Sequence, residues 1–305
     1  MRRAFVLSGG ASLGAIQVGM LRALFEREIA PDLIVGTSAG AINGAYVASR
    51  GASIETADGL GEIWRGLRRS DIFPANPLTG FVGFIGRSDH LVPDSGLRGV
   101  IRAHHQLDRL EEARVPLHVI ATDVLSGAER RLSRGPAEEA IMASAAIPGV
   151  FAPIEWEGRL LMDGGVSNNA PISHAIELGA EEVYVLPTGY ACALADPPRS
   201  ALAMLLHSMS LLINRRLLRD IELLADRASL VVLPPPCPQR VQPIDFGRAG
   251  ELITESLAGS RAFLEALEAG GAEIPRHAQL QGLLPHEHEA VGVAGWANPE
   301  TRLTA

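Results

Sequence analysis

The sequence is poor in cysteine and in aromatic residues. Its 305 residues include two cysteines, Cys192 and Cys237, and aromatic side chains make up 5% of the chain. Two cysteines without metal-ligand spacing exclude a disulfide framework and a cysteine-based metal site. A reducing compartment fits this composition, and we therefore expect the protein to be cytoplasmic.

An excess of basic residues is also lacking. The chain carries 27 Lys and Arg against 35 Asp and Glu, which gives a formal net charge of −8. A nucleic acid held through its phosphates needs a basic face, so we expect no nucleic-acid partner. Lipid is not excluded, because apolar side chains can carry membrane association, and a transient contact with a membrane surface stays open.

Long hydrophobic runs are absent as well. A membrane-spanning helix needs about 18 consecutive apolar residues. The nearest stretch, residues 201–213, is interrupted by His207 and two serines. The apolar run at residues 4–7 is too short for a secretory segment and leads directly into a glycine-rich turn. We expect a soluble chain.

Hydrophobic residues make up 47% of the sequence, which is enough to form a sizeable buried core. Segments with strand character alternate with segments of helical periodicity, which predicts a three-layer α/β/α fold with a mainly parallel central sheet. We expect strands at residues 3–8, 33–35, 115–121, 127–132, 159–162, 182–186 and 230–233. We expect helices at residues 15–27, 41–49, 53–69, 95–103, 136–142, 171–178, 202–226 and 246–267. One domain over residues 1–270 and a mobile tail over 271–305 complete this prediction.

The pattern Gly-x-Ser-x-Gly occurs at Gly36, Ser38 and Gly40. An expected strand precedes it and an expected helix follows it, which is the context of a nucleophile elbow. Glycines on both sides fit because a bulky Cβ there would collide with the neighbouring strand or helix. A structural Gly/Ser loop is the alternative for this pattern taken alone.

A second glycine-rich turn, residues 8–14, follows the first expected strand, with Gly9, Gly10 and Gly14 separated by Ala11 and two further residues. It presents backbone N–H groups toward an anion. A dinucleotide-binding loop is one interpretation, but Gly-x-Gly-x-x-Gly is absent and Asp32 precedes the second strand instead of ending it. The other interpretation is an oxyanion hole beside the elbow, and it explains both motifs with one site.

A serine nucleophile needs a base. The nine histidines have no convincing setting: several lie in the tail, and His118 lies inside an expected strand. Asp163, followed by Gly164 and Gly165, ends an expected strand at the rim of the sheet, where partial burial would raise its pKa toward a useful basicity. An ordinary Asp-Gly-Gly turn is the alternative.

Taken together, four ordered motifs resemble the patatin-like phospholipase family. They are the glycine loop at residues 8–14, the elbow at 36–40, the Ala-Ser-x-x-x-Pro segment at 143–148 and Asp-Gly-Gly at 163–165. Ala121-Thr122-Asp123 also looks like the family's usual strand end. The resemblance covers residues 4–190, the motif core, and extends less surely over the helices of residues 200–270.

The resemblance implies a catalytic domain with a Ser38–Asp163 dyad that hydrolyses carboxyl esters of lipids through an acyl-enzyme, with no metal and no cofactor. The N–H groups of Gly9, Gly10 and Ala11 would stabilise the oxyanion. Supporting positions carried over from the motifs are Gly14, Gly36, Gly40, Gly164 and Gly165.

Two departures from the family pattern stand in the glycine loop. Ala11 replaces a third glycine, and an alanine fits there if its φ is negative. Leu13 replaces a basic residue, which puts a phospholipid preference in doubt more than ester hydrolysis. Two alternatives therefore stay open: a lipid- or partner-binding protein with weak turnover, and an acyltransferase that uses the same dyad.

Three further segments allow alternatives. Residues 71–96 form an apolar, glycine-rich insertion that is either an irregular cover or a flap over an acyl site. The helix at 202–226 is typical of a core-covering or subunit-contact element, so a homo-oligomer stays open. The His-Glu-His-Glu tract at 286–289 resembles a metal tract only superficially.

Overall fold

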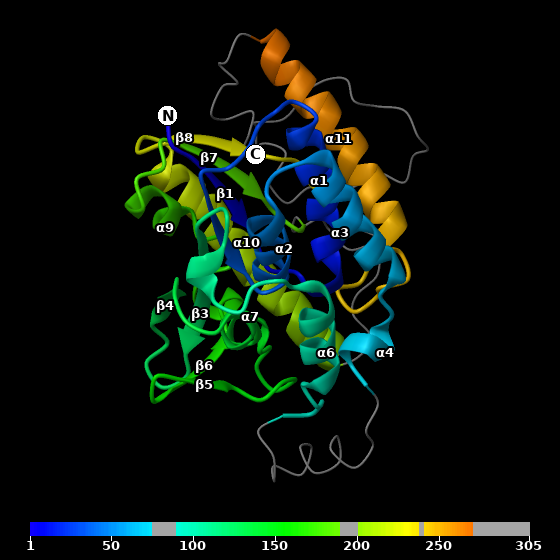
Figure 1. Ribbon diagram of the computed structural model, residues 1–305, viewed down its shortest axis with the longest axis vertical. Coiled ribbons are helices and arrows are strands. Elements are labelled where there is room, and N and C mark those ends of the chain that lie inside the picture. The colour runs from blue at the N-terminus through cyan, green and yellow to red at the C-terminus, as the bar shows by residue number, and fades with distance from the viewer. Residues whose placement is uncertain (75–89, 190–200, 238–240, 271–305) are drawn as a thin grey trace, which may run out of the picture.

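The computed structural model describes residues 1–74, 90–189, 201–237 and 241–270, in which one sheet lies between layers of helices (Figure 1). The strands are β1 (Arg3–Leu7), β2 (Leu33–Thr37), β3 (Leu117–Asp123), β4 (Glu129–Leu132), β5 (Ile154–Trp156), β6 (Arg159–Asp163), β7 (Glu182–Leu186) and β8 (Ser229–Val232). The helices are η1 (Ala11–Gly14), α1 (Ala15–Phe25), α2 (Ala39–Arg50), α3 (Ile54–Gly66), α4 (Arg69–Ile72), α6 (Ser95–His104), η2 (Leu110–Glu112), α7 (Ala137–Ala145), α8 (Gly165–Asn168), α9 (Ile172–Glu177), α10 (Ala201–Leu224) and α11 (Ala249–Ala269).

Strands β3, β2, β1, β7 and β8 are neighbours in this order and all pair in parallel. Strands β4 and β6 pair antiparallel with β3, and β5 pairs antiparallel with β6. The expected mainly parallel sheet is confirmed. The strand expected at residues 127–132 forms an antiparallel hairpin with β3, and β6 and β5 extend the antiparallel part of the sheet.

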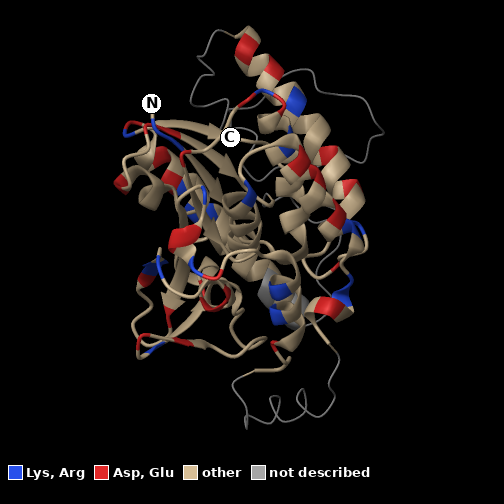
Figure 2. Cartoon of the chain, viewed as in Figure 1, with Lys and Arg blue, Asp and Glu red and all other residues tan. Residues whose placement is uncertain are grey.

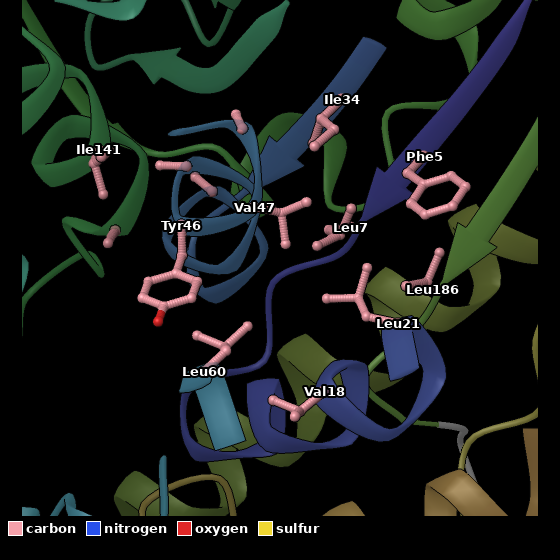
Figure 3. Packing of buried hydrophobic residues seen from close by; sticks show 14 of the residues in the cluster. Phe5, Leu7, Val18, Leu21, Ile34, Tyr46, Val47, Leu60, Ile141 and Leu186 are labelled. Atoms are coloured by element: carbon pink, nitrogen blue, oxygen red, sulfur yellow. The ribbon is translucent and has the colours of Figure 1, made fainter. Parts of the chain in front are cut away.

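Alternate residues along the strands enter two different hydrophobic clusters, as strand geometry requires. Phe5 and Leu7 of β1 join the cluster that includes α1, α2, α3, α7 and α11, whereas Ala4 and Val6 join the cluster with α9 and α10. Figure 3 shows Phe5 and Leu7 among side chains of the first cluster, close to Leu21 of α1. The predicted three layers are therefore confirmed, and charged side chains lie mainly outside them (Figure 2).

The turn between β5 and β6 makes these two strands an antiparallel hairpin. Its two central residues, Glu157 and Gly158, have φ values of 49° and 75°. Positive φ at both positions is the signature of a two-residue hairpin turn of type I′. The hairpin makes β6 return antiparallel to β5 and brings its last residue, Asp163, to the rim of the parallel strands.

The long helix α10 covers the sheet with its C-terminal half, where Leu217, Ile221 and Leu224 are buried in the second cluster. Leu212 and Leu223 point outward, with 67% and 63% of their surfaces exposed. Among the helices of the described segments, none combines the length and the apolar character that a membrane span requires.

Several predictions concern segments outside the described residues. Most of the insertion at 71–96 falls in 75–89, and its ends form α4 and the start of α6. The expected tail, 271–305, and the His-Glu-His-Glu tract within it also lie outside.

Candidate active site

Strand β3 brings Ser38 and Asp163 together. Its first part pairs with both β2 and β4, and its last part pairs with both β4 and β6. A strand has two edges, so β2 and β6 lie on the same edge of β3 and run toward each other. Thr37 stands opposite Ile120, and Asp163 stands opposite Ala121, the next residue of β3. The two strands therefore end facing each other, with Ser38 and Asp163 at the junction.

The Ser38 hydroxyl donates a hydrogen bond of 2.7 Å to Asp163 Oδ2, and each residue is only 7% exposed. The second carboxylate oxygen, Oδ1, accepts a bond of 2.7 Å from the N–H of Gly165. Burial raises the pKa of Asp163 to about 6, and these two hydrogen bonds offset only part of that effect. A carboxyl group with this pKa is mostly ionised at neutral pH and basic enough to accept a proton.

The backbone of Ser38 is strained, with φ 55° and ψ −121° just before α2 begins at Ala39. Non-glycine residues keep such angles only where the surrounding structure enforces them. Enforcement comes from close packing at both glycines of the motif. A Cβ on Gly36 would lie 2.6 Å from the Gly40 carbonyl oxygen, and one on Gly40 would lie 2.7 Å from the Ser8 carbonyl oxygen.

The glycine loop lies against Ser38, because a Cβ on Gly9 would stand 2.9 Å from the Ser38 Cβ. The N–H of Gly9 donates to Asn169 Oδ1 at 3.1 Å. Within the described segments, the N–H groups of Gly10 and Ala11 donate no hydrogen bond. Two of the three donors expected for an oxyanion are thus available, and the third is engaged by an asparagine.

The negative φ with which an alanine would fit is not found: the φ of Ala11 is 51°, in the left-handed region that favours glycine. The helix η1 begins at this residue, directly after Gly10, where a Cβ would collide with the Thr188 side chain. Leu13, at the position where the resemblance led us to look for a cation, is 8% exposed and belongs to the hydrophobic core.

The remaining motif glycines also mark close approaches. A Cβ on Gly14 would lie 2.9 Å from that of Ala39 and collide with the Trp64 ring. One on Gly164 would collide with the Ile120 carbonyl, and one on Gly165 would lie 3.0 Å from Asp163 Oδ1. All ten site positions named from the sequence therefore gather at one end of the sheet.

Ser144 has a position that its motif did not specify. Its hydroxyl accepts a hydrogen bond of 2.8 Å from the Ser38 N–H and donates to the Ile120 carbonyl of β3. It thereby fixes the elbow to β3, the strand that pairs with β6 and its last residue, Asp163. The Ala-Ser-x-x-x-Pro segment was the available signal, but nothing in it indicated a partner.

A buried polar network behind the glycine loop was not foreseen at all. Gln17 Nε2 donates to the carbonyls of Ser8 and Leu186, each at 2.9 Å. Asn43 Nδ2 donates to the Gly14 carbonyl and to Gln17 Oε1, and Asn43 Oδ1 accepts from Trp64 Nε1 at 2.8 Å. These bonds connect the loop, the helix after the elbow and α3.

A largely apolar pocket with about 690 Å³ of empty space, open solvent included, begins at Ser38 and Ala11. Its walls come from α2, α3, α4, α6 and α7 and from Phe246. The apolar lining residues include Ile42, Leu60, Ile63, Trp64, Phe73, Leu97, Val100 and Phe151. An apolar pocket that begins at a few polar groups is typical of a small-molecule or acyl-chain site.

Other chemistries find less support in the described residues. Those segments hold no cluster of three potential metal ligands. Asp32, the candidate for ribose binding, accepts a hydrogen bond of 2.7 Å from the Arg3 N–H at the start of β1, a strand's length from the glycine loop. His174 pairs with Glu129 at 2.9 Å and takes no part in the Ser38 site.

The chain was also compared with known protein families. The family model described as "Patatin-like phospholipase" matches residues 5–176, more than half of the chain, and this span contains every motif discussed above. The protein belongs to the patatin-like phospholipase family.

Among curated relatives, an uncharacterised NTE family protein of Mycobacterium bovis is 31% identical over 190 residues, which cover 59% of this chain and 47% of that protein. Human patatin-like phospholipase domain-containing protein 6 is 30% identical over 188 residues, which cover 61% of this chain and 13% of the human protein. The chain thus matches less than half of the length of these relatives.

Among solved structures, VipD from Legionella pneumophila has a TM-score of 0.42 at 14% identity, over 85% of this chain and 67% of that one. Human GIVD cytosolic phospholipase A2, in complex with methyl gamma-linolenyl fluorophosphonate, also has a TM-score of 0.42, at 12% identity over 88% and 58% of the two chains.

Proposed function

We propose that the protein is a serine-dependent lipid acyl hydrolase that cleaves carboxyl esters of phospholipids, lysophospholipids or neutral lipids. The observation that carries this proposal is the 2.7 Å hydrogen bond from the buried Ser38 hydroxyl to Asp163, a carboxyl group whose pKa is raised to about 6. No histidine is needed, because an aspartate of this basicity accepts the proton directly.

In the first half-reaction, Ser38 Oγ attacks the ester carbonyl while its proton passes to Asp163 Oδ2. The negative charge on the carbonyl oxygen is stabilised by the unengaged N–H groups of Gly10 and Ala11. Asp163 then returns the proton to the leaving alcohol oxygen, and the acyl group stays on Ser38. Asp163 then takes a proton from a water molecule, whose oxygen attacks the acyl carbonyl. The bond to Ser38 Oγ breaks, Asp163 returns the proton to that oxygen, and the fatty acid is released.

The apolar pocket supports the substrate class. Its opening at Ser38 and Ala11 leads along apolar side chains, so an acyl chain bound there leaves water as its carbonyl reaches the nucleophile. With Leu13 buried in the core, the loop itself offers no side-chain cation to a headgroup phosphate. We therefore place the selectivity of the enzyme in the acyl chain. Cytoplasmic location remains part of the proposal and rests on the two-cysteine composition.

The test is hydrolysis of p-nitrophenyl esters of graded chain length by the wild type, Ser38→Ala and Asp163→Asn. Each substitution should lower kcat/KM by at least about 10³-fold, the effect of losing a nucleophile or a general base. A fluorophosphonate probe should label the wild type and Ser260→Ala, which removes a buried hydroxyl of α11, but not Ser38→Ala.

Each outcome assigns the protein to one class. A folded wild type that neither turns over nor labels would leave a lipid- or partner-binding protein. If added alcohols accept the acyl group faster than water does, the protein is an acyltransferase with the same dyad.

A further inference from the structure

The carbonyl group of Gly9 accepts hydrogen bonds from two side chains that lie far away in the sequence. Thr188 Oγ1 donates to the carbonyl oxygen at 2.6 Å, and Asn169 Nδ2 donates to it at 3.2 Å. Thr188 belongs to the loop after β7 and is 5% exposed, whereas Asn169 directly follows α8. Two separate loops therefore hold one carbonyl oxygen of the glycine loop.

Thr188 is itself held against the glycine loop. Strands β1 and β7 lie side by side and pair in parallel, so the loops that follow them leave the same end of the sheet (Figure 1). The Thr188 N–H donates to Ser8 Oγ at 3.0 Å. The Thr188 Cβ lies 2.6 Å from the position that a Cβ on Gly10 would occupy. Thr188 thus contacts the residues on both sides of Gly9.

The peptide group between Gly9 and Gly10 connects this carbonyl to a donor of the candidate oxyanion hole. A peptide group is planar and trans, so its C=O and its N–H point in opposite directions. Because the Gly9 oxygen is turned toward Thr188 and Asn169, the N–H of Gly10 is turned away from them. Over the part of the chain that the structure describes, this N–H donates no hydrogen bond. The next residue, Ala11, lines the pocket together with Ser38.

We propose that Thr188 and Asn169 are positioning residues for the oxyanion hole. By holding the Gly9 carbonyl, they direct the Gly10 N–H toward the carbonyl oxygen of a bound ester. This inference rests on the proposed esterase function, because the oxyanion forms when Ser38 attacks the ester.

The two hydrogen bonds act on the Gly10 N–H in two ways. They fix its direction before the reaction begins, so no reorientation is needed as negative charge develops on the ester oxygen. They also polarise the peptide group, since hydrogen bonds in a chain strengthen one another. Thr188 has the larger part, because its bond to the Gly9 oxygen is the shorter of the two.

The experiment compares the hydrolysis of p-nitrophenyl decanoate by the wild type, Thr188→Ala and Thr188→Ser. Loss of one oxyanion donor lowers kcat by about 10²–10³-fold. In Thr188→Ala the Gly10 N–H stays in the chain and loses only its fixed direction. We therefore expect kcat to fall by about 10–100-fold and KM to change by less than about twofold. Thr188→Ser keeps the hydroxyl and should retain most of the wild-type kcat. Asn169→Ala should lower kcat in the same way but by a smaller factor.

A second measurement separates positioning from a general loss of structure. An alkyl trifluoromethyl ketone accepts Ser38 Oγ at its carbonyl carbon, the serine proton passes to Asp163, and the ketone oxygen becomes the oxyanion. Its inhibition constant in Thr188→Ala should rise by the same factor as kcat/KM falls, because both depend on the oxyanion hole. The inflection of the pH-rate profile should stay near the pKa of Asp163, about 6.

Thr56→Ala and Thr56→Ser are the matched controls. Thr56 is 7% exposed, and its hydroxyl forms a hydrogen bond of 3.2 Å with Ser53 Oγ at the start of α3. These substitutions make the same chemical changes at a buried threonine that does not contact the glycine loop. They should leave kcat and the inhibition constant unchanged. Circular dichroism and thermal melts establish that each variant is folded.

Three results would overturn the proposal: a kcat of Thr188→Ala within about twofold of the wild type, equal losses in Thr188→Ala and Thr188→Ser, or an unchanged inhibition constant in a variant whose kcat falls. If Thr188→Ala does not fold, Asn169→Ala decides, and a wild-type kcat in that variant is equally contrary. Failure of the esterase function is recognised separately, because the folded wild type would then not hydrolyse the decanoate.

Discussion

The carboxyl group of Asp163 makes the rate of the proposed reaction dependent on pH. Only the ionised form accepts the Ser38 proton, and burial raises its pKa to about 6. We predict that kcat/KM falls about tenfold per pH unit below this pKa and is constant above it. The measurement is kcat/KM for p-nitrophenyl decanoate as a function of pH. A profile with its inflection near pH 4 would show that the pKa of the Asp163 carboxyl group is not raised.

The same shift predicts an effect on stability. The folded-state pKa of Asp163 lies above its ordinary value of 3.8, so the fold binds the proton more tightly than the unfolded chain does. The associated stability is fully present below pH 3.8 and is lost as the pH rises through about 6. Asp163→Asn, which cannot ionise, should therefore raise Tm at pH 8 but not at pH 4. Equal changes in Tm at both pH values would argue against a desolvated carboxylate.

Ala11 carries strain that glycine would relieve. Its φ of 51° disfavours any residue with a Cβ by about 1–2 kcal/mol, whereas the flexibility of an unfolded glycine offsets about 0.5–1 kcal/mol of the gain. Ala11→Gly should stabilise the protein by about 0.5–1 kcal/mol in urea unfolding. Ala262→Gly, at an exposed position inside α11, is the control and should destabilise by about 1 kcal/mol. Destabilisation by both would mean that the loop tolerates Ala11 without strain.

For individual residues, the sequence predicted the site correctly where the motifs contain glycine. The positions of Ser38 and Asp163 followed from Gly-x-Ser-x-Gly and Asp-Gly-Gly, because glycines record close approaches that only they permit. The conformation of Ala11 did not follow, because a positive φ is signalled in a sequence by glycine and this position holds an alanine. The Asn43 network was missed because its partners, Gln17 and Trp64, are close to it in space but not in the sequence.

Among the elements, the crossing of α1 and α11 depends on Gly19. A Cβ there would lie 2.5 Å from the Ile253 carbonyl oxygen and 2.5 Å from the Leu257 nitrogen. Gly19→Ala should therefore destabilise by about 1–3 kcal/mol, the usual effect of overpacking. Gly99, on the exposed side of α6, has no atom near the position of a Cβ. Gly99→Ala should stabilise by about 0.5–1 kcal/mol, because it reduces the entropy of the unfolded chain. Chemical unfolding of the two variants side by side measures the difference, and equal effects would contradict the close crossing.

The positions of most helices and strands were predictable because the spacing of apolar residues within each segment indicates its secondary structure. Strand β7 has the predicted bounds, and α1, α3, α6 and β8 differ from their predicted ranges by a few residues at their ends. Strand β5 was missed since its three residues are too few to show alternation. The antiparallel direction of β6 relative to β5 follows from the turn at Glu157 and Gly158, which can be recognised in the sequence only once β5 is known.

On the scale of the whole molecule, the core extends beyond the segment that defines the family. Leu252, Ile253 and Leu264 of α11 belong to the same hydrophobic cluster as β1 and α1, and β8 extends the sheet. We propose that residues 1–270 form one folding unit and predict that this fragment melts cooperatively, with a Tm within a few degrees of the full chain. A fragment of residues 1–190 should lack a cooperative transition, because it leaves the α1 surface uncovered. Cooperative folding of the shorter fragment would place the domain boundary near residue 190.

The meeting of β2 and β6 on one edge of β3 separates the reaction from the choice of substrate. The spacing of Ser38 and Asp163 is set by consecutive residues of a single strand. The pocket walls formed by α3, α4 and α6 come from the chain between β2 and β3. This segment does not contribute to the distance between Ser38 and Asp163. Insertions, deletions and exchanges in that segment can therefore change the proposed acyl site while Ser38 and Asp163 keep their distance. The positions of Ser38 and Asp163 are therefore fixed by the sheet, whereas the pocket walls can be replaced. Directed evolution of selectivity for the acyl chain of the proposed substrate should begin in residues 54–104.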